Sequence, residues 1–131
     1  MQWKQEFSVG VDALDNDHKI LFDLVDQFER ASSMGKSSEH IAAVLDTLVD
    51  YTKGHFQREE DMMEKYGFPG LEEHREGHRK LAAQVVDFCS RYEAGDTSVT
   101  NDLIAFLNNW LQIHILDEDM QYKPSLEGKD L

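Results

Sequence analysis

The fold is constrained most by four long segments in which apolar residues recur every three or four positions. Glycine-containing turns separate these segments at 34–38, 67–70 and 94–98. This spacing puts apolar side chains on one face of an α-helix, and no alternation typical of a β-strand extends over a useful length. Because short connections make neighbouring helices antiparallel, the sequence predicts an all-α, up-down-up-down four-helix bundle.

The chain length of 131 residues suits one domain with a single core. We therefore expect one domain over 1–131, with an irregular N-terminal arm over 1–10 that packs on the bundle through Trp3 and Phe7. The predicted helices lie at about 12–33, 38–66, 71–94 and 98–122.

The charge balance narrows the range of partners. The chain has 13 Lys and Arg against 26 Asp and Glu, a formal net charge of −13. Such a field repels phosphate backbones and anionic lipids, so we expect no binding to nucleic acid and no insertion into membranes. The single cysteine, Cys89, and the absence of a signal-like start predict a cytoplasmic protein, which we expect to be a monomer.

Five of the six histidines fall on the predicted inward faces, where aliphatic residues are usual: His18, His55, His74, His78 and His114. His55 and Glu59 are four residues apart, as are the two histidines of the third segment, so each pair projects from one face of its helix. Counted from the turns at ~1.5 Å per residue, His18 is level with His55, and His78 with His114, within about 2 Å. We expect one polar layer inside the bundle.

A single inward histidine is more often a hydrogen-bonded core residue than a ligand, but five in one layer favour a metal site, since metals use neutral imidazoles directly. Five imidazoles and at least two carboxylates exceed the four ligands of a tetrahedral zinc, and calcium and magnesium prefer oxygen. Iron, copper, nickel and zinc all suit imidazole with carboxylate, and bridging carboxylates suit a metal pair. The residues alone therefore predict a dinuclear site.

The second carboxylate has two candidates. Glu118 follows His114 by four residues and shares its face on a regular helix, whereas Asp119 follows by five and is rotated by about 140°. Helix geometry therefore favours Glu118.

The order of these residues resembles the hemerythrin family. His18 is followed by H-F-Q-R-E at 55–59, H-R-E-G-H at 74–78 and H-I-L-D-E-D at 114–119. The opening W-x-x-x-F-S-V-G-V with L-D-N-D-H-K, and the closing W-L-x-x-H with D-M-Q-Y, are similar to single-domain bacteriohemerythrins. This resemblance covers essentially the whole chain.

The resemblance implies two non-haem iron ions with an oxo or hydroxo bridge. The implied ligands are His74, His78 and His114 for one iron and His18 and His55 for the other, with Glu59 and Asp119 bridging both. It thus favours Asp119 over Glu118. It further implies reversible O2 binding at the iron with two histidines, with O2 held as a hydroperoxide, for storage, transport or delivery.

Apolar side chains next to these ligands are predicted to line an O2 pocket and exclude water, although they also fit a plain core: Leu21, Phe22, Phe56, Trp110, Leu111 and Ile115. Two carboxylates donate less charge than the larger sets of oxygen-activating di-iron sites, so our hypothesis is binding without enzymatic activity. The alternatives are a di-iron oxidase or peroxidase, for which an inward Glu118 would be the indication, and an O2 or iron sensor. We expect O2 as ligand and a redox or O2-consuming protein as partner.

Overall fold

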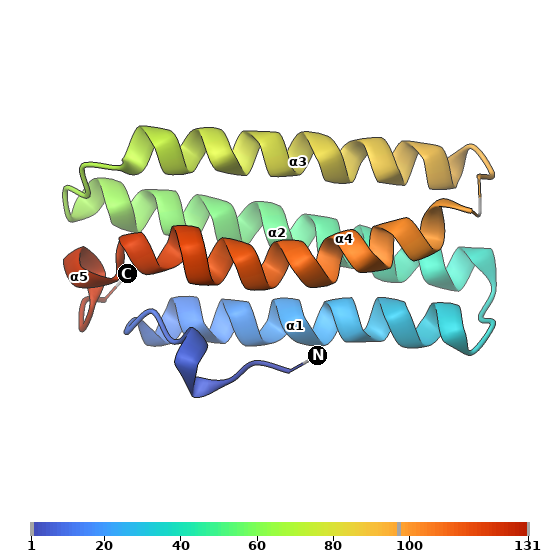
Figure 1. The fold of residues 1–131 in the computed structure, drawn as a ribbon, viewed down its shortest axis with the longest axis horizontal. Helices are drawn as coiled ribbons and strands as arrows, with labels where there is room; N and C mark the ends of the chain where they lie inside the picture. The colour runs from blue at the N-terminus through green and yellow to red at the C-terminus, as the bar shows by residue number, and fades with distance from the viewer. Residues whose placement is uncertain (1, 97, 131) are drawn as a thin grey trace.

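A computed structural model describes residues 2–96 and 98–130 of the chain, and these residues form helices and connecting turns without a strand. The long helices are α1 (Asp12–Ser33), α2 (Ser38–Lys65), α3 (Leu71–Glu93) and α4 (Val99–Ile113). Consecutive helices run antiparallel, and each packs on two neighbours around a closed bundle (Figure 1). The predicted all-α four-helix bundle is confirmed.

The helix ends follow from local chemistry. The Ser37 hydroxyl accepts a hydrogen bond of 3.1 Å from the backbone N–H of His40 and caps the start of α2. Gly35 and Gly67 follow the ends of α1 and α2 with φ of +66° and +69°, a left-handed conformation that glycine adopts without steric strain. The third predicted turn, 94–98, includes residue 97, which lies outside the described residues.

The fourth helix differs from the prediction of one continuous helix over 98–122. Regular α4 ends at Ile113 and is followed by a π-helical turn at His114–Glu118, a 3-10 turn at Asp119–Gln121 and the short α5 at Lys123–Leu126. The backbone N–H of Asp119 donates to the carbonyl of His114, five residues earlier. This wider turn changes which side chain follows His114 on the inner face.

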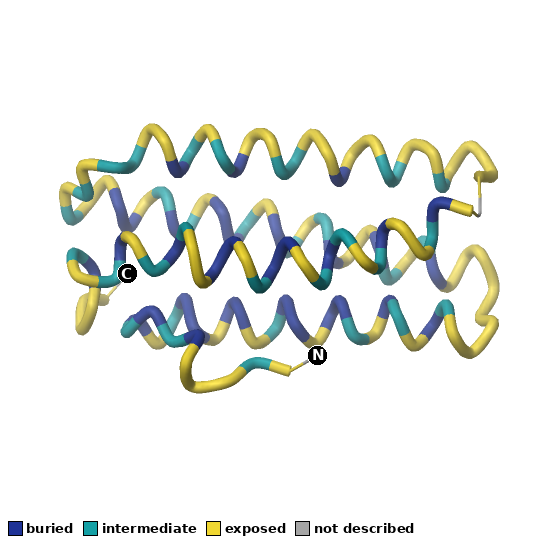
Figure 2. The backbone as a smooth tube through the Cα atoms, viewed as in Figure 1, coloured by how far each residue is buried: buried dark blue, intermediate teal, exposed yellow. Residues whose placement is uncertain are grey.

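Buried residues line the inward face of each helix (Figure 2) and form two hydrophobic clusters. The larger one includes Leu21 and Phe28, and the smaller one lies at one end of the bundle and includes Leu14 and Met62. On α1, His18 lies between Leu14 of the small cluster and Leu21 of the large one. The polar layer therefore separates two apolar regions.

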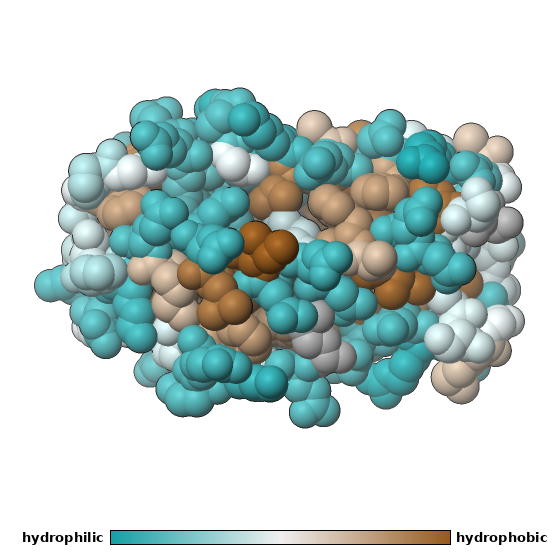
Figure 3. All heavy atoms as spheres, in the orientation of Figure 1, coloured by the Kyte–Doolittle hydropathy of each residue, from teal (hydrophilic) through white to brown (hydrophobic). Residues whose placement is uncertain are grey.

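The N-terminal arm packs on the bundle. Within the described part of the arm, residues 2–10, Gln5–Phe7 form a 3-10 turn, and the buried Phe7 ring stacks on Phe22 with centroids 5.4 Å apart. The outer face in Figure 3 is mainly hydrophilic, with apolar side chains over α4, where Ile113 remains 55% exposed. None of the described helices has the length and apolar character needed to cross a membrane.

Candidate metal centre

The bundle brings all seven predicted ligands together, although they come from four different parts of the chain. Each is buried, and the set is His18, His55, Glu59, His74, His78, His114 and Asp119. The helices place the imidazole ring edges around two carboxylates, so the layer expected from residue counting exists in three dimensions.

Glu59 occupies the centre of this layer and is fully buried. Its Oε1 lies 3.3 Å from Nε2 of His55, one turn earlier on α2, and 3.2 Å from Nε2 of His78 on α3. Its Oε2 lies 3.5 Å from Nε2 of His18 on α1. One carboxylate therefore reaches imidazoles from three helices.

Asp119 faces Glu59 across the layer and is also fully buried. Its Oδ1 lies 3.1 Å from Nε2 of both His74 and His114, and its Oδ2 lies 3.0 Å from Nε2 of His18. Oε1 of Glu59 also lies 3.8 Å from Nε2 of His74 and of His114, so His18, His74 and His114 lie close to both carboxylates.

The Nε2 atoms of all five histidines are buried without a hydrogen-bond partner, as are Oε1 of Glu59 and both carboxylate oxygens of Asp119. Burying this many polar atoms without partners is strongly unfavourable. A metal ion accepts the same lone pairs that lack a donor here, so the donor set fits a metal. Two overlapping groups have ligand atoms within 4.8 Å of one another: Glu59, His74, His78, His114 and Asp119; and His18, His55, Glu59 and Asp119.

The electrostatics of the layer favour positive charge at its centre. Burial lowers the pKa of His18 and His74, but the nearby carboxylates of Asp119 and Glu59 outweigh it and raise both pKa values to about 9. Burial raises the pKa of Glu59, but the surrounding histidines, His55 first among them, hold it well below its usual range. The cluster is built to hold cations.

The π-turn decides between the two candidate carboxylates. It brings Asp119 next to His114 although the two residues are five apart, because the backbone N–H of Asp119 reaches the carbonyl of His114 as well as that of Ile115. Glu118 lies outside the cluster, where its Oε2 is 3.0 Å from Nδ1 of His114 and its side chain is 40% exposed. Glu118 thus neither joins the cluster nor points only to solvent.

Asp17 positions His55 and was not singled out from the sequence. The Nδ1 of His55 donates to Oδ2 of Asp17 over 2.9 Å, and the same carboxylate accepts from Arg58 at 2.7 and 2.9 Å and from the Tyr51 hydroxyl at 2.6 Å. Burial raises the pKa of Asp17, but these donors lower it further than burial raises it. The only sequence signal was its position beside His18.

Glu60 has the same role for His78. Its Oε2 lies 2.8 Å from Nδ1 of His78, and its Oε1 accepts from Nε of Arg75 at 3.0 Å. Carboxylates that hold the second nitrogen fix the tautomer and orientation of a ligating imidazole. Three of the five histidines are oriented in this way, by Asp17, Glu60 and Glu118.

Tyr122 is a further residue that sequence reasoning missed. Its hydroxyl donates to Oε2 of Glu59 over 2.5 Å, and the side chain is fully buried. Burial, followed by the charge of Glu59, raises the pKa of Tyr122 well above its usual value. A neutral phenol is therefore fixed against a central carboxylate, from the last residue of the predicted fourth helix, and its only signal in the sequence was the closing D-M-Q-Y motif.

The six residues predicted to line an O2 pocket are all buried in the larger hydrophobic cluster. Phe56 stacks on His78 with ring centroids 3.8 Å apart and 8° between the planes, and Trp110 stacks on His114 at 6.0 Å. Leu21, Phe22, Leu111 and Ile115 belong to the same cluster. Aromatic rings thus cover one side of the polar layer.

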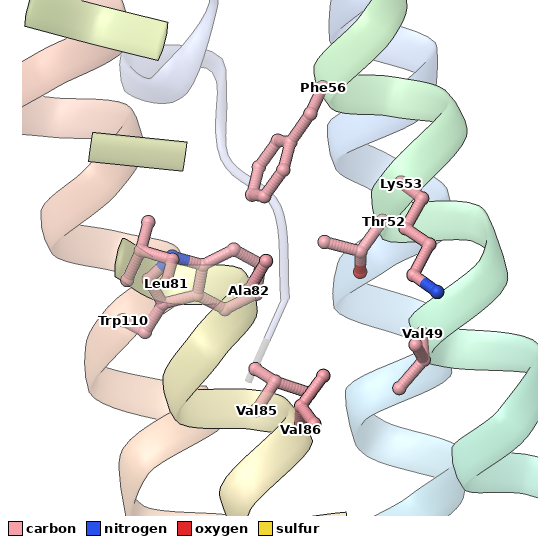
Figure 4. Close-up of a pocket in the computed structure, with 9 residues that line it drawn as sticks. All are labelled: Val49, Thr52, Lys53, Phe56, Leu81, Ala82, Val85, Val86 and Trp110. Atoms are coloured by element: carbon pink, nitrogen blue, oxygen red, sulfur yellow. The ribbon is translucent and has the colours of Figure 1, made fainter. Parts of the chain in front are cut away.

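A small apolar cavity of about 20 Å³ lies beside Phe56 and Trp110, between α2, α3 and α4 (Figure 4). Val49, Leu81 and Val85 form much of its wall. The Thr52 hydroxyl donates to the carbonyl of Leu48 at 2.7 Å, so its hydrogen atom is directed away from the cavity.

Comparisons with known proteins agree with this arrangement. The family model described as the hemerythrin HHE cation binding domain matches residues 9–126. A bacteriohemerythrin from Methylococcus capsulatus is 35% identical, with 98% of each chain covered. One from Stenotrophomonas maltophilia is 30% identical over 96% of this chain and 81% of the relative.

The fold is similar to that of a solved protein as well. A crystal structure of wild-type hemerythrin superposes with a TM-score of 0.90 and 33% identity, covering 98% of both chains. Sequence, fold and the buried histidine–carboxylate cluster lead to one conclusion: the chain belongs to the hemerythrin family and carries a metal-binding site of the hemerythrin type.

Proposed function

We propose that this protein binds O2 reversibly at a pair of non-haem iron ions joined by an oxo or hydroxo bridge. The observation that carries the proposal is the unequal division of ligand atoms into two overlapping groups. The group with His74 and His78 of α3 and His114 of the π-turn has three imidazoles, whereas the group of His18 and His55 has two. Glu59 and Asp119 belong to both groups. The second ion would therefore have one protein ligand fewer and a position for an outside molecule.

When bound, the iron pair supplies the electrons that O2 accepts and returns. The surrounding residues orient the ligands and keep water away. Asp17 holds the ring of His55, and the hydroxyl of Tyr122 fixes Glu59. The six buried apolar residues predicted to line the O2 pocket would exclude the water and protons that promote irreversible oxidation.

The apolar cavity beside Phe56 supports an uncharged small ligand. A volume of about 20 Å³ is enough for one water-sized molecule. Apart from Thr52 and Lys53 the residues that line it are apolar, and O2 needs no hydrogen bond to enter such a space.

The contact made by Glu118 favours binding over oxidase or peroxidase chemistry. Its carboxylate is engaged by Nδ1 of His114, on the side with three imidazoles. It therefore offers no free proton-transfer group to the two-histidine side of the cluster.

Metal analysis combined with a reversible spectroscopic cycle tests the proposal. The loaded protein is reduced without air, exposed to O2 and then freed of O2 under argon. We expect about two irons per chain and a charge-transfer colour that appears with O2 and vanishes on its removal. Irreversible oxidation or catalytic consumption of reductant would favour an oxidase or peroxidase, and a protein without iron would refute the site.

A matched pair of variants separates the site from general effects. His55→Ala should abolish the colour, because His55 is one of only two imidazoles in its group. His40→Ala changes an exposed histidine outside the cluster and should leave the colour intact.

A further inference from the structure

A polar cleft reaches the cluster from solvent. It has a volume of about 460 Å³, and the residues that line it include Glu73, His74, Gly77, Lys80, Glu118 and Gln121. They come from the first half of α3 and the segment after α4, which lie at the same end of the bundle (Figure 1). His74 is itself one of the seven candidate ligands, whereas the apolar cavity beside Phe56 is lined by none of them.

The ring of His74 separates the cleft from the cluster. The residue is only 7% exposed, and its Nε2 lies 3.1 Å from Oδ1 of Asp119. Among the described residues, its Nδ1 has no carboxylate partner, in contrast to Nδ1 of His55, His78 and His114. His74 thus has one nitrogen committed to the cluster and one without a carboxylate, in a side chain that lines the cleft.

Gly77 keeps the cleft open beside Glu118. A Cβ atom at this position would lie 3.1 Å from Oε2 of Glu118, so any larger side chain would project into the space. Glycine inside a helix is unfavourable relative to alanine, so this residue weakens α3 locally. Because Gly77 has no side chain, open space remains next to the carboxylate of Glu118.

The charge of the cleft selects cations. Glu76 is paired with Arg79 at 2.9 Å, but Glu73 and Glu118 also contribute carboxylates, and Lys80 is the one cationic side chain among the described residues that line the cleft. The formal net charge of −13 strengthens the same field. Such a field raises the local concentration of cations and has no effect on neutral O2.

We propose that this cleft is the route by which a divalent cation, ferrous iron in the cell, enters the cluster. Glu73 and Glu118 attract the hydrated ion, and His74 passes it from the cleft to Glu59 and Asp119. The inference rests on the proposed function only in requiring that the cluster holds metal.

The test measures how fast the metal-free full-length protein takes up Co²⁺, by stopped-flow absorption, after circular dichroism has shown that each variant is folded. Glu73→Lys reverses a charge in the cleft and should slow uptake about three- to tenfold, with a larger effect at low salt. Gly77→Leu fills the cleft and should slow both uptake by the metal-free protein and release from the loaded protein to a chelator by more than about tenfold. Neither variant should change the final metal content.

Glu93→Lys provides the matched control. It makes the same charge change at an exposed position near the other end of α3 and should load at the wild-type rate. Wild-type loading rates in both cleft variants, or equal slowing by Glu93→Lys, would overturn the proposed route while leaving the metal site intact. If Gly77→Leu lowers the final metal content, the rate for Glu73→Lys decides. A wild-type protein that takes up no Co²⁺ would refute the route, whereas the iron content of the loaded protein separately decides the proposed function.

Discussion

Asp119 follows His114 by five residues, yet its Oδ1 lies 3.1 Å from Nε2 of that histidine, inside one buried cluster. The π-turn makes this contact, because the backbone N–H of Asp119 bonds to the carbonyl of His114. In a regular α-helix, Glu118 would occupy the inner position. Here the carboxylate of Glu118 instead bonds to Nδ1 of His114. One turn therefore supplies Asp119 as a candidate ligand and Glu118 as the group that orients His114.

The first prediction separates these two carboxylates. Asp119→Asn should lose metal, because it removes a negative charge shared by both ligand groups. Glu118→Gln should keep the full metal content, but the metal affinity of this variant should fall about 10–100-fold. This is the usual effect of removing the group that holds the second nitrogen of a ligating histidine. Metal content after dialysis and competition with a chelator measure both. Full retention by Asp119→Asn with complete loss in Glu118→Gln would contradict the assignment.

The second prediction concerns the hydroxyl of Tyr122. Tyr122→Phe leaves Oε2 of the buried Glu59 without its donor, so the free energy of unfolding should fall by about 2 kcal/mol. Chemical denaturation of the metal-free protein measures this change. Tyr66→Phe is the control, since its hydroxyl contacts an exposed backbone carbonyl at Asp130, and it should change stability by under about 0.5 kcal/mol. Equal effects of both variants would show that the contact with Glu59 has no special weight.

The third prediction concerns the carboxylate that orients His55. Asp17→Asn keeps the shape of the side chain but weakens its bonds to His55, Arg58 and Tyr51. We expect metal affinity at the two-histidine position to fall about 10–100-fold. Asp23→Asn, at a carboxylate that accepts a hydrogen bond from the exposed Gln27, should bind metal normally. Titration against a chelator distinguishes them, and indistinguishable affinities would refute the role of Asp17.

The fourth prediction is a pH dependence. The pKa values of His18 and His74 are raised to about 9 from 6.5, so their stabilising contribution is fully present below pH 6.5 and lost as pH rises through about 9. One pKa unit corresponds to about 1.4 kcal/mol. The metal-free protein should therefore lose several kcal/mol of stability across this window, while metal affinity rises because binding needs neutral imidazoles.

Urea unfolding at pH 6.5, 8 and 9.5, with and without metal, measures this dependence. His74→Gln should flatten the slope of the metal-free protein, whereas His40→Gln, at an exposed position, should preserve it. A metal-free protein whose stability does not change over the window would contradict the prediction.

Local patterns in the sequence predicted most of the fold. The spacing of apolar residues and the glycine turns define α1 from Asp12 to Ser33 and the starts of α2 and α3, because helix periodicity and turn chemistry act over a few residues. They failed after Ile113, where the π-turn interrupts the helix. A helical turn that is wider by one residue leaves no signal in the spacing of apolar residues, because the same residues fit a regular α-helix and a π-turn.

The sequence by itself determined the bundle and the gathering of imidazoles at one level, because periodicity sets the face and turn positions set the height of each side chain. Only the tertiary structure decided how the cluster is completed. Asp17, Glu60 and Tyr122 reach the site from neighbouring helices or from the last turn, and His74 alone among the ligands lines the cleft. Such contacts depend on how helices pack against one another, and no local rule of sequence encodes that geometry.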